Sequence, residues 1–218
     1  MPIAPKHPVP VFPLPGVVLF PHAPLALHVF ELRYRNMVRD ALAGERKFAM
    51  ATLKPGWEAD YYGSPEFHEL GCVAQFEHVE WLPDDCYNLR IRGVERVLFT
   101  KVVNEFPYRS CEVEPLPVTP YDEDDPLVEM ERDTLMEATR RLLPLGSEAW
   151  LQPPLSIGEI RFEAIVNMIA HSLRIPAEAR LEMLAMDGVF DRSRRLLEHL
   201  RQMHAAKPAP PPDTGGRN

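Results

Sequence analysis

The segment from Phe12 to Arg35 constrains the fold more than any other part of this 218-residue chain. Its first ten residues, FPLPGVVLFP, are mostly apolar and are interrupted by proline and glycine, which is typical of short strands joined by turns. From about Glu31 the apolar residues recur with the 3.6-residue period of a helix. The change of period predicts two short strands followed by an amphipathic helix, and none of these residues forms a catalytic motif.

The helix that this change of period predicts covers residues 31–43 and carries its apolar side chains on one stripe. Gly44 is placed to end it as a left-handed cap, because glycine adopts positive φ without steric cost. Glu31 and Arg35 are spaced one turn apart, so we expect an ion pair between them.

A series of short strands follows, at residues 48–53, 70–81, 87–92, 97–103 and 109–114. Gly93 interrupts the alternation of apolar and polar residues, which indicates a bulge or a tight bend. Six or seven strands with one inserted helix predict a small, PUA-like, partly open β-barrel over residues 8–118, since closure removes exposed strand edges.

The second part of the chain is helical. Residues 119–125 form an acidic, proline-rich linker, and Asp125 followed by Pro126 is a favourable helix start. Four helices are predicted, at 126–143, from the capping box at 156–159 to 173, at 176–186 and at 189–203. We expect them to form an antiparallel four-helix bundle over 126–204, with a disordered tail at 205–218, and the whole chain to be of the α+β class.

Charge and composition exclude several classes of protein. The formal net charge is −8, and both sides of residue 118 carry more acidic than basic residues, which argues against binding a nucleic-acid backbone. Arginines 192, 194, 195 and 201 lie close together, but acidic residues lie among them, so a solvated helix face is expected. No run reaches the roughly 20 apolar residues of a membrane span, and the start lacks a signal peptide.

Three cysteines, Cys72, Cys86 and Cys111, occur in strand-like segments far apart in the sequence. An odd number with this spacing fits buried thiols in a reducing compartment better than disulfides. We therefore expect a cytoplasmic protein.

The opening segment resembles the start of the Lon-protease N-terminal domain, in which F-P-L-x-x-x-V-L-F-P precedes an I-F-E-x-R-Y helix start. The strand start at Gly71, the turn from Gly93 to Arg96 and the helical segment from Ala170 to Leu200 resemble further parts of that domain, although Ile175-Pro176 and Arg180 depart from its pattern. The resemblance covers roughly residues 8–203 and includes the cereblon-type form of the domain. It implies a stand-alone, substrate-binding Lon domain with a PUA-like barrel joined to a helical bundle.

Motifs of enzymatic chemistry are missing from the sequence. No glycine is followed by lysine, so the chain has no nucleotide-binding P-loop, and no serine and lysine share the context of a peptidase dyad. The histidines form no metal-binding spacing beyond His78 and Glu80, which share one face of a strand. Cys86 lies beside Asp84 and Asp85, whose charges disfavour a thiolate. We expect no catalytic residue, no cofactor and no metal.

The hypothesis that remains is a non-catalytic module that binds polypeptide, an unfolded substrate or a partner protein, through exposed apolar surface. The residues selected for that surface are Trp57, Tyr61 and Tyr62, in a long loop, and Trp150, in a connector between helices. We expect the surface near the junction of the barrel and the bundle. The alternatives are an RNA-binding PUA-like module and a residual peptidase or hydrolase; the sequence leaves the ligand and the oligomeric state open.

Overall fold

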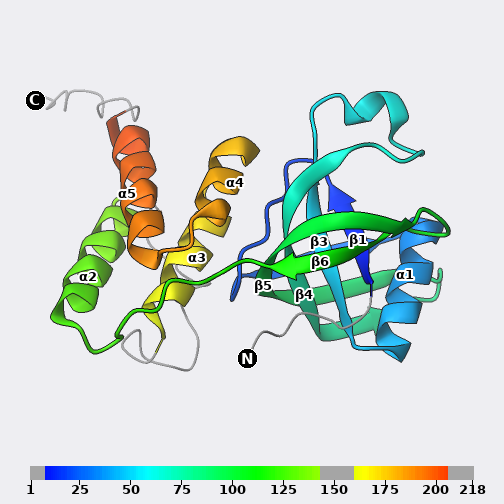
Figure 1. Cartoon of the computed structure of the whole chain (residues 1–218), viewed down its shortest axis with the longest axis horizontal. Helices are drawn as coiled ribbons and strands as arrows, with labels where there is room; N and C mark the ends of the chain where they lie inside the picture. Colours follow the sequence, from blue (N-terminus) through cyan, green and yellow to red (C-terminus); the bar gives the residue numbers. More distant parts are fainter. Residues whose placement is uncertain (1–7, 143–159, 206–218) are drawn as a thin grey trace, which may run out of the picture.

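A computed structural model describes residues 8–142 and 160–205, and it confirms the α+β class (Figure 1). Strands and one helix occupy the first half of the chain, and four helices lie together beside them. The strands are β1 (Val9–Leu14), β2 (Pro24–Val29), β3 (Lys47–Leu53), β4 (Phe67–Trp81), β5 (Tyr87–Asn104) and β6 (Ser110–Pro115). The helices are α1 (Leu32–Ala43), α2 (Pro126–Arg140), α3 (Phe162–Ser172), α4 (Ala177–Ala185) and α5 (Val189–Ala205), with a 3-10 turn, η1 (Trp57–Asp60).

The six strands form one mixed sheet in the order β2-β5-β4-β3-β1-β6. Strands β1 and β3 pair in parallel, and the other pairs are antiparallel. Strand β6 pairs with β1 and also with the second half of β5. These pairings describe a mixed sheet. That the sheet curves into a PUA-like, partly open barrel stays a prediction.

Gly93 lies at an irregularity of the sheet, as the sequence predicts. The register between β4 and β5 shifts beside it, where Val73 faces Glu95 but Ala74 faces Gly93. A Cβ atom on Gly93 would lie 2.0 Å from the carbonyl oxygen of Phe20. Only glycine allows the segment before β2 to approach β5 this closely.

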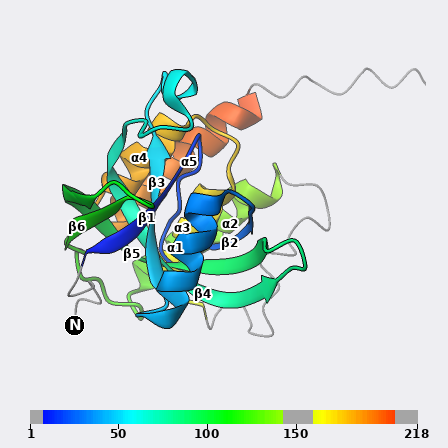
Figure 2. The ribbon, with the colours of Figure 1, turned by 90° about the vertical axis from the view of Figure 1, so that its right-hand side faces the viewer.

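Helix α1 lies across the strands with Tyr34, Met37, Val38 and Ala41 buried beneath it (Figure 2). The predicted left-handed cap at Gly44 is wrong, because its φ is −102°. The positive φ occurs two residues later, at Arg46 (58°), whose N–H donates to the carbonyl of Ala41. The helix therefore ends in a wider turn than glycine alone would make.

Helices α2, α4 and α5 begin and end within three residues of their predicted bounds, whereas α3 begins later than predicted. Asp125 caps α2 as expected, with its carboxylate accepting from the N–H of Leu127 at 2.9 Å. Helix α3 begins at Phe162 with Arg161 as its N-cap, and the predicted capping box at 156–159 lies outside the described residues. Residues 206–218 also lie outside them, so the disordered tail, like the four-helix bundle arrangement, stays a prediction.

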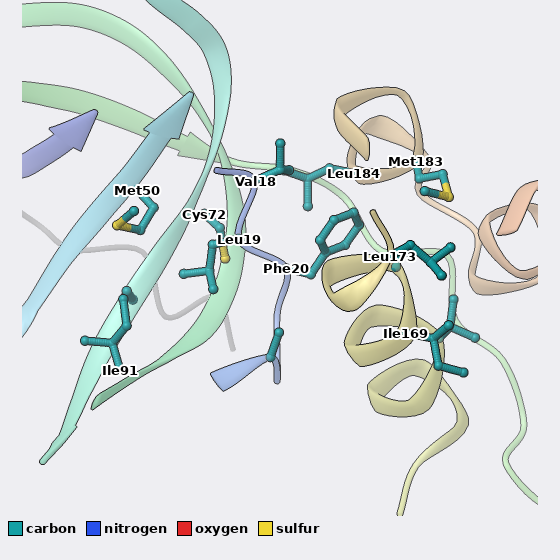
Figure 3. Packing of buried hydrophobic residues seen from close by; sticks show 14 of the residues in the cluster. Val18, Leu19, Phe20, Met50, Cys72, Ile91, Ile169, Leu173, Met183 and Leu184 are labelled. Carbon is teal, nitrogen blue, oxygen red and sulfur yellow. The ribbon is translucent and has the colours of Figure 1, made fainter. Parts of the chain in front are cut away.

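The opening segment joins the two halves of the molecule. Figure 3 shows Leu19 pointing toward the sheet, while Val18 and Phe20 point toward the helices. All three side chains are at least 98% buried, and they belong to one hydrophobic cluster that includes residues of both halves. The imidazole Nδ1 of His171, on α3, lies 2.9 Å from the carbonyl oxygen of Val18.

Two buried arginines hydrogen-bond to the helical half, one from the sheet and one from within that half. Arg96, on β5, donates to the carbonyls of Leu184 and Met186, both at 2.8 Å, and to that of Pro117. Arg192, on α5, is fully buried and donates to the side chain of Asn167 at 2.6 Å. The expectation of a solvated helix face is therefore wrong for Arg192, because its guanidinium satisfies groups inside the helical half.

Candidate functional site

A largely apolar hollow with exposed aromatic rings is lined by three segments that Figure 1 shows at the end of the strands away from α2–α5. It has a volume of about 470 Å³ and lies between the start of α1, the loop after η1 and the turn from β5 to β6. We call it the aromatic groove. Its apolar wall consists of Leu32, Tyr34, Tyr62, Phe106 and Tyr108.

The outer residues of the groove are unusually exposed for their size. Tyr62 is 89% exposed, Phe106 is 85% exposed and Leu32 is 62% exposed. Each comes from a different segment of the chain, so folding brings the three together at one site. Adjacent apolar side chains that remain in water at such a place are typical of a binding surface.

Arg33 holds the loop that carries Tyr62. Its guanidinium donates to the carbonyls of Tyr61 and Gly63, each at 2.9 Å, and its Nε donates to Glu31 at 3.0 Å. The hydroxyl of Tyr61 donates to the same Glu31 carboxylate at 2.8 Å, and this hydrogen bond raises the pKa of Tyr61. The loop is therefore fixed to the start of α1 on both sides of Tyr62.

These contacts correct the predicted ion pair between Glu31 and Arg35. Glu31 precedes the helix in extended backbone conformation, so its side chain turns toward Arg33 and Tyr61 instead of toward the next helical turn. Arg35 pairs with Asp85, in the turn between β4 and β5, at 2.9 Å.

Arg109 forms the inner wall of the groove. It is 92% buried; its Nη1 donates to the carbonyl of Pro65 at 2.6 Å, and its guanidinium lies 4.7 Å from the centre of the Phe67 ring. Its Nη2 has no hydrogen-bond partner. Burial lowers the pKa of Arg109, as expected for a cation removed from water.

The predicted site residues are only partly brought together. The rings of Trp57, Tyr61 and Tyr62 form a chain with centroid distances of 5.4 and 5.1 Å, but only Tyr62 lines the groove. Trp150 lies outside the described residues. The expected position near the junction with the helices is wrong for the tyrosines, because Tyr61 contacts the start of α1 and Tyr62 faces the β5–β6 turn.

Sequence reasoning missed Leu32 and Phe106. Phe106 lies next to Pro107 in a short turn between two strands, where polar residues are usual. Two adjacent apolar residues in a turn between strands could therefore have indicated a binding surface. Leu32 offered no comparable signal, since an apolar residue at a helix start is ordinary.

The remaining titratable groups offer no reactive nucleophile in the described part of the chain. All three thiols are free and buried there, and burial raises the pKa of Cys72 to about 12 and that of Cys111 to about 11. Burial, followed by the hydrogen bond to Asp84, raises the pKa of Cys86. The carboxylate of Glu80 accepts from the amide of Asn88 at 2.8 Å.

Residues 8–142 and 160–205 lack two further kinds of functional feature. No group of three or more His, Cys, Asp or Glu side chains there is arranged to hold a metal ion. No helix in that part of the chain combines the length and the hydrophobicity needed to cross a membrane.

Comparison with known proteins places the whole described chain in one family. A family model described as the ATP-dependent protease La (LON) substrate-binding domain matches residues 8–202. The chain is 21% identical over 197 residues to a Lon protease of Flavobacterium johnsoniae, covering 90% of this chain and 24% of that protein. It is 24% identical over 195 residues to a Lon protease of Anaeromyxobacter dehalogenans, covering 89% and 23%. The chain thus spans about a quarter of the length of these curated relatives.

Solved structures show the same fold. The crystal structure of a Lon N-terminal domain protein from Xanthomonas campestris matches with a TM-score of 0.59 and 24% identity, over 93% of this chain and 99% of that one. The N-terminal domain of a Mycobacterium avium complex Lon protease matches with a TM-score of 0.63 and 15% identity, over 89% and 98%.

Proposed function

This chain belongs to the family of ATP-dependent protease La (LON) substrate-binding domains, and from this premise we propose that it binds polypeptide at the aromatic groove. The observation that carries the proposal is that two large and strongly exposed side chains, Tyr62 and Phe106, come from different segments of the chain and line one apolar hollow. A large ring covers apolar side chains of a ligand at small cost in conformational entropy. Unfolded or partly unfolded chains present such side chains.

The groove is held ready for a ligand. The hydrogen bonds of Arg33 to Tyr61 and Gly63 fix the backbone on both sides of Tyr62. A preformed site loses less conformational freedom when it binds, so more of the contact energy appears as affinity. We therefore favour the groove as the binding site over the surface around Trp57, whose ring contacts that of Tyr61 outside the groove.

Binding without catalysis is part of the proposal. Burial raises the pKa of Cys72 and of Cys111, which disfavours a thiolate, and the hydroxyl of Ser64 and the Nη1 of Arg109 are engaged in hydrogen bonds within the walls of the groove. A cytoplasmic location and the absence of a cofactor remain predictions from the sequence.

The charges around the groove favour polypeptide over RNA. Arg33, Arg109 and Glu105 line the groove, and Arg33 is paired with Glu31 beside it, so the two basic side chains are matched by two acidic ones. A site for a phosphate backbone needs several basic side chains in excess, which this balance does not provide.

Binding of a permanently unfolded protein tests the proposal. The probe is reduced and carbamidomethylated α-lactalbumin, with the native protein as the folded comparison. We expect Tyr62→Ser and Phe106→Ser each to weaken binding about tenfold, since a central aromatic contact typically contributes 1–2 kcal/mol or more. Trp81→Ser is the matched control, because Trp81 is 69% exposed on the β4–β5 turn away from the groove. Equal affinity of all three variants and the parent would reject the groove.

A further inference from the structure

Strands β4 and β5 separate at the end of the sheet that carries the groove. Their pairing runs from Trp81–Tyr87 to Leu70–Leu98. Among the pairings of these fully described strands, none joins residues 67–69 of β4 to residues 99–104 of β5. Figure 1 shows the two strands diverging toward η1 and the β5–β6 turn.

Both separated edges face each other without a strand between them. The other edge of β4 pairs with β3 at Phe67–Leu53, and the other edge of β5 pairs with β6 from Val97 to Asn104. The N–H and C=O groups that point into the separation therefore have no strand partner. Such an edge is a ready template for another extended chain.

A cavity of about 390 Å³ occupies the separation. Phe67 and Glu69 of β4 line it together with Phe99, Thr100 and Val102 of β5. The rings of Phe67 and Phe99 contact each other between the two strands, with centroids 5.2 Å apart, so an added strand would lie beside this pair of rings. Ser64, Glu105 and Arg109 line both this cavity and the aromatic groove. The two hollows are therefore neighbours that share one polar wall, and one ligand can occupy both.

The free edge of β5 has the irregular geometry of a strand that leaves its sheet. Its register against β6 shifts twice, between Phe99 and Lys101 and between Val102 and Asn104. Such bulges redirect a strand at the rim of a sheet. Val102 and Val103 are both exposed there, so apolar side chains on both faces of β5 are accessible beside the separation.

We infer that an extended segment of the bound polypeptide adds as a strand between β4 and β5. The inference rests on the proposed function, because the same polypeptide would continue into the aromatic groove. At about 3.3 Å per residue, the three free residues of β4 limit pairing on both sides to about three ligand residues. Since β4 and β5 are antiparallel, the added strand is parallel to one of them and antiparallel to the other.

The charges of this site favour recognition of a ligand's main chain over recognition of a particular sequence of side chains. The cavity contains Lys54, Lys101 and Arg109 together with Glu66, Glu69 and Glu105, so positive and negative side chains are equal in number. Main-chain hydrogen bonds supply the affinity in strand addition, and alternate side chains enter pockets. The ligand class is therefore an extended segment with free backbone N–H groups and an apolar side chain for the space beside Phe67 and Phe99.

N-methylation of a peptide tests the inference. The probe is the fluorescein-labelled decapeptide Gly-Ser-Val-Thr-Phe-Thr-Val-Thr-Ser-Gly, whose successive N–H groups point to opposite sides when it is extended. One variant peptide is methylated on the first two threonines, a second on the phenylalanine and the following valine, and a control on the two serines. Three paired residues place two N–H groups on one side and one on the other. We expect the methylated set that removes two of them to bind about tenfold more weakly and the set that removes one to bind about threefold more weakly, while the control binds like the parent.

Two measurements on the protein accompany the peptide series. Hydrogen exchange of the backbone amides at 67–69 and 99–104 should slow when the parent peptide is added. Val102→Asn should weaken binding of the peptide at least fivefold, while Val118→Asn, an exposed valine in the linker, should leave it unchanged.

The outcomes separate this inference from the proposed function. If all three methylated peptides bind like the parent and exchange is unchanged, while Tyr62→Ser still weakens binding, strand addition is rejected and the groove is retained. An effect of only one methylated set places the peptide on a single edge and overturns insertion between the two strands. If neither the parent peptide nor unfolded α-lactalbumin binds, the proposed function fails first.

Discussion

Arg96 is the residue whose charge connects the sheet to the helical half. Its side chain is almost fully buried, and it donates to three backbone carbonyls and to the carboxylate of Asp187 at 3.2 Å. Arg96→Met keeps the length of the side chain but leaves these buried acceptors without a donor. We expect the free energy of unfolding to fall by about 3–5 kcal/mol, measured by urea denaturation. Arg90→Met, at an exposed arginine of the same strand, should change it by less than about 0.5 kcal/mol, and an equal loss in both variants would contradict this account.

Glycine at position 93 permits the close approach of the opening segment to β5. An added methyl group would overlap the backbone of Phe20, which cannot move without disturbing the junction. Gly93→Ala is expected to lower the free energy of unfolding by about 3 kcal/mol or more. Gly44→Ala is the control, because the nearest atom to its Cβ would be 3.5 Å away and its φ is negative. If thermal unfolding shows the two variants to be equally stable, the close approach is not what selects glycine at position 93.

At the scale of elements, the contact between α3 and the opening segment includes His171, whose charged form is disfavoured by burial. Burial lowers the pKa of His171, because the charged imidazole loses its hydration between the two elements. The unfolded chain takes up a proton near pH 6.5, while the folded chain does so only at lower pH. The unfolded state therefore binds more protons in this window, and the free energy of unfolding falls as the pH drops below about 6.5.

The variant His171→Gln tests this pH dependence. Glutamine does not titrate, so between pH 6.5 and 5 the stability of the variant should fall less than that of the parent, by at most about 1.4 kcal/mol per pH unit. The measurement is urea denaturation at half-unit steps of pH. His28→Gln, an exposed histidine on β2, should retain the slope of the parent. A parallel decline in all three proteins would show that His171 does not contribute.

The sequence predicted the elements well because their signals are local. Asp125 before Pro126 marks a helix start, and Gly93 interrupts an alternating pattern, so both were identified without any tertiary information. The aromatic groove was not predictable in the same way, since Leu32, Tyr62 and Phe106 meet only after three distant segments have packed. The burial of Arg192 was missed for a related reason. Its acidic neighbours in sequence suggested a solvated face, whereas its guanidinium donates to Asn167 on another helix.

For the whole molecule, the shared core argues against two independent domains. Val18 and Phe20 belong to the strand half of the sequence but are buried against α3 and α4 (Figure 3), and Arg96, on β5, donates to Leu184, Met186 and Asp187 of the helical half. A division of the chain near residue 118 would expose these side chains to water. We therefore expect one cooperative unfolding transition, because neither half completes its core alone.

Two probes, one for each half, can measure this cooperativity. In a Trp150→Phe background the remaining tryptophans, Trp57 and Trp81, report on the strand half, while far-ultraviolet circular dichroism at 222 nm follows mainly the helices. Leu196→Ala, at a fully buried position of α5, should cost about 2–5 kcal/mol. In a single cooperative unit it must shift the fluorescence midpoint as far as the dichroism midpoint, although no tryptophan lies near it. A shift confined to the dichroism signal would mean that the strand half keeps its structure without the helices, and the predicted division into two domains would then be the correct description.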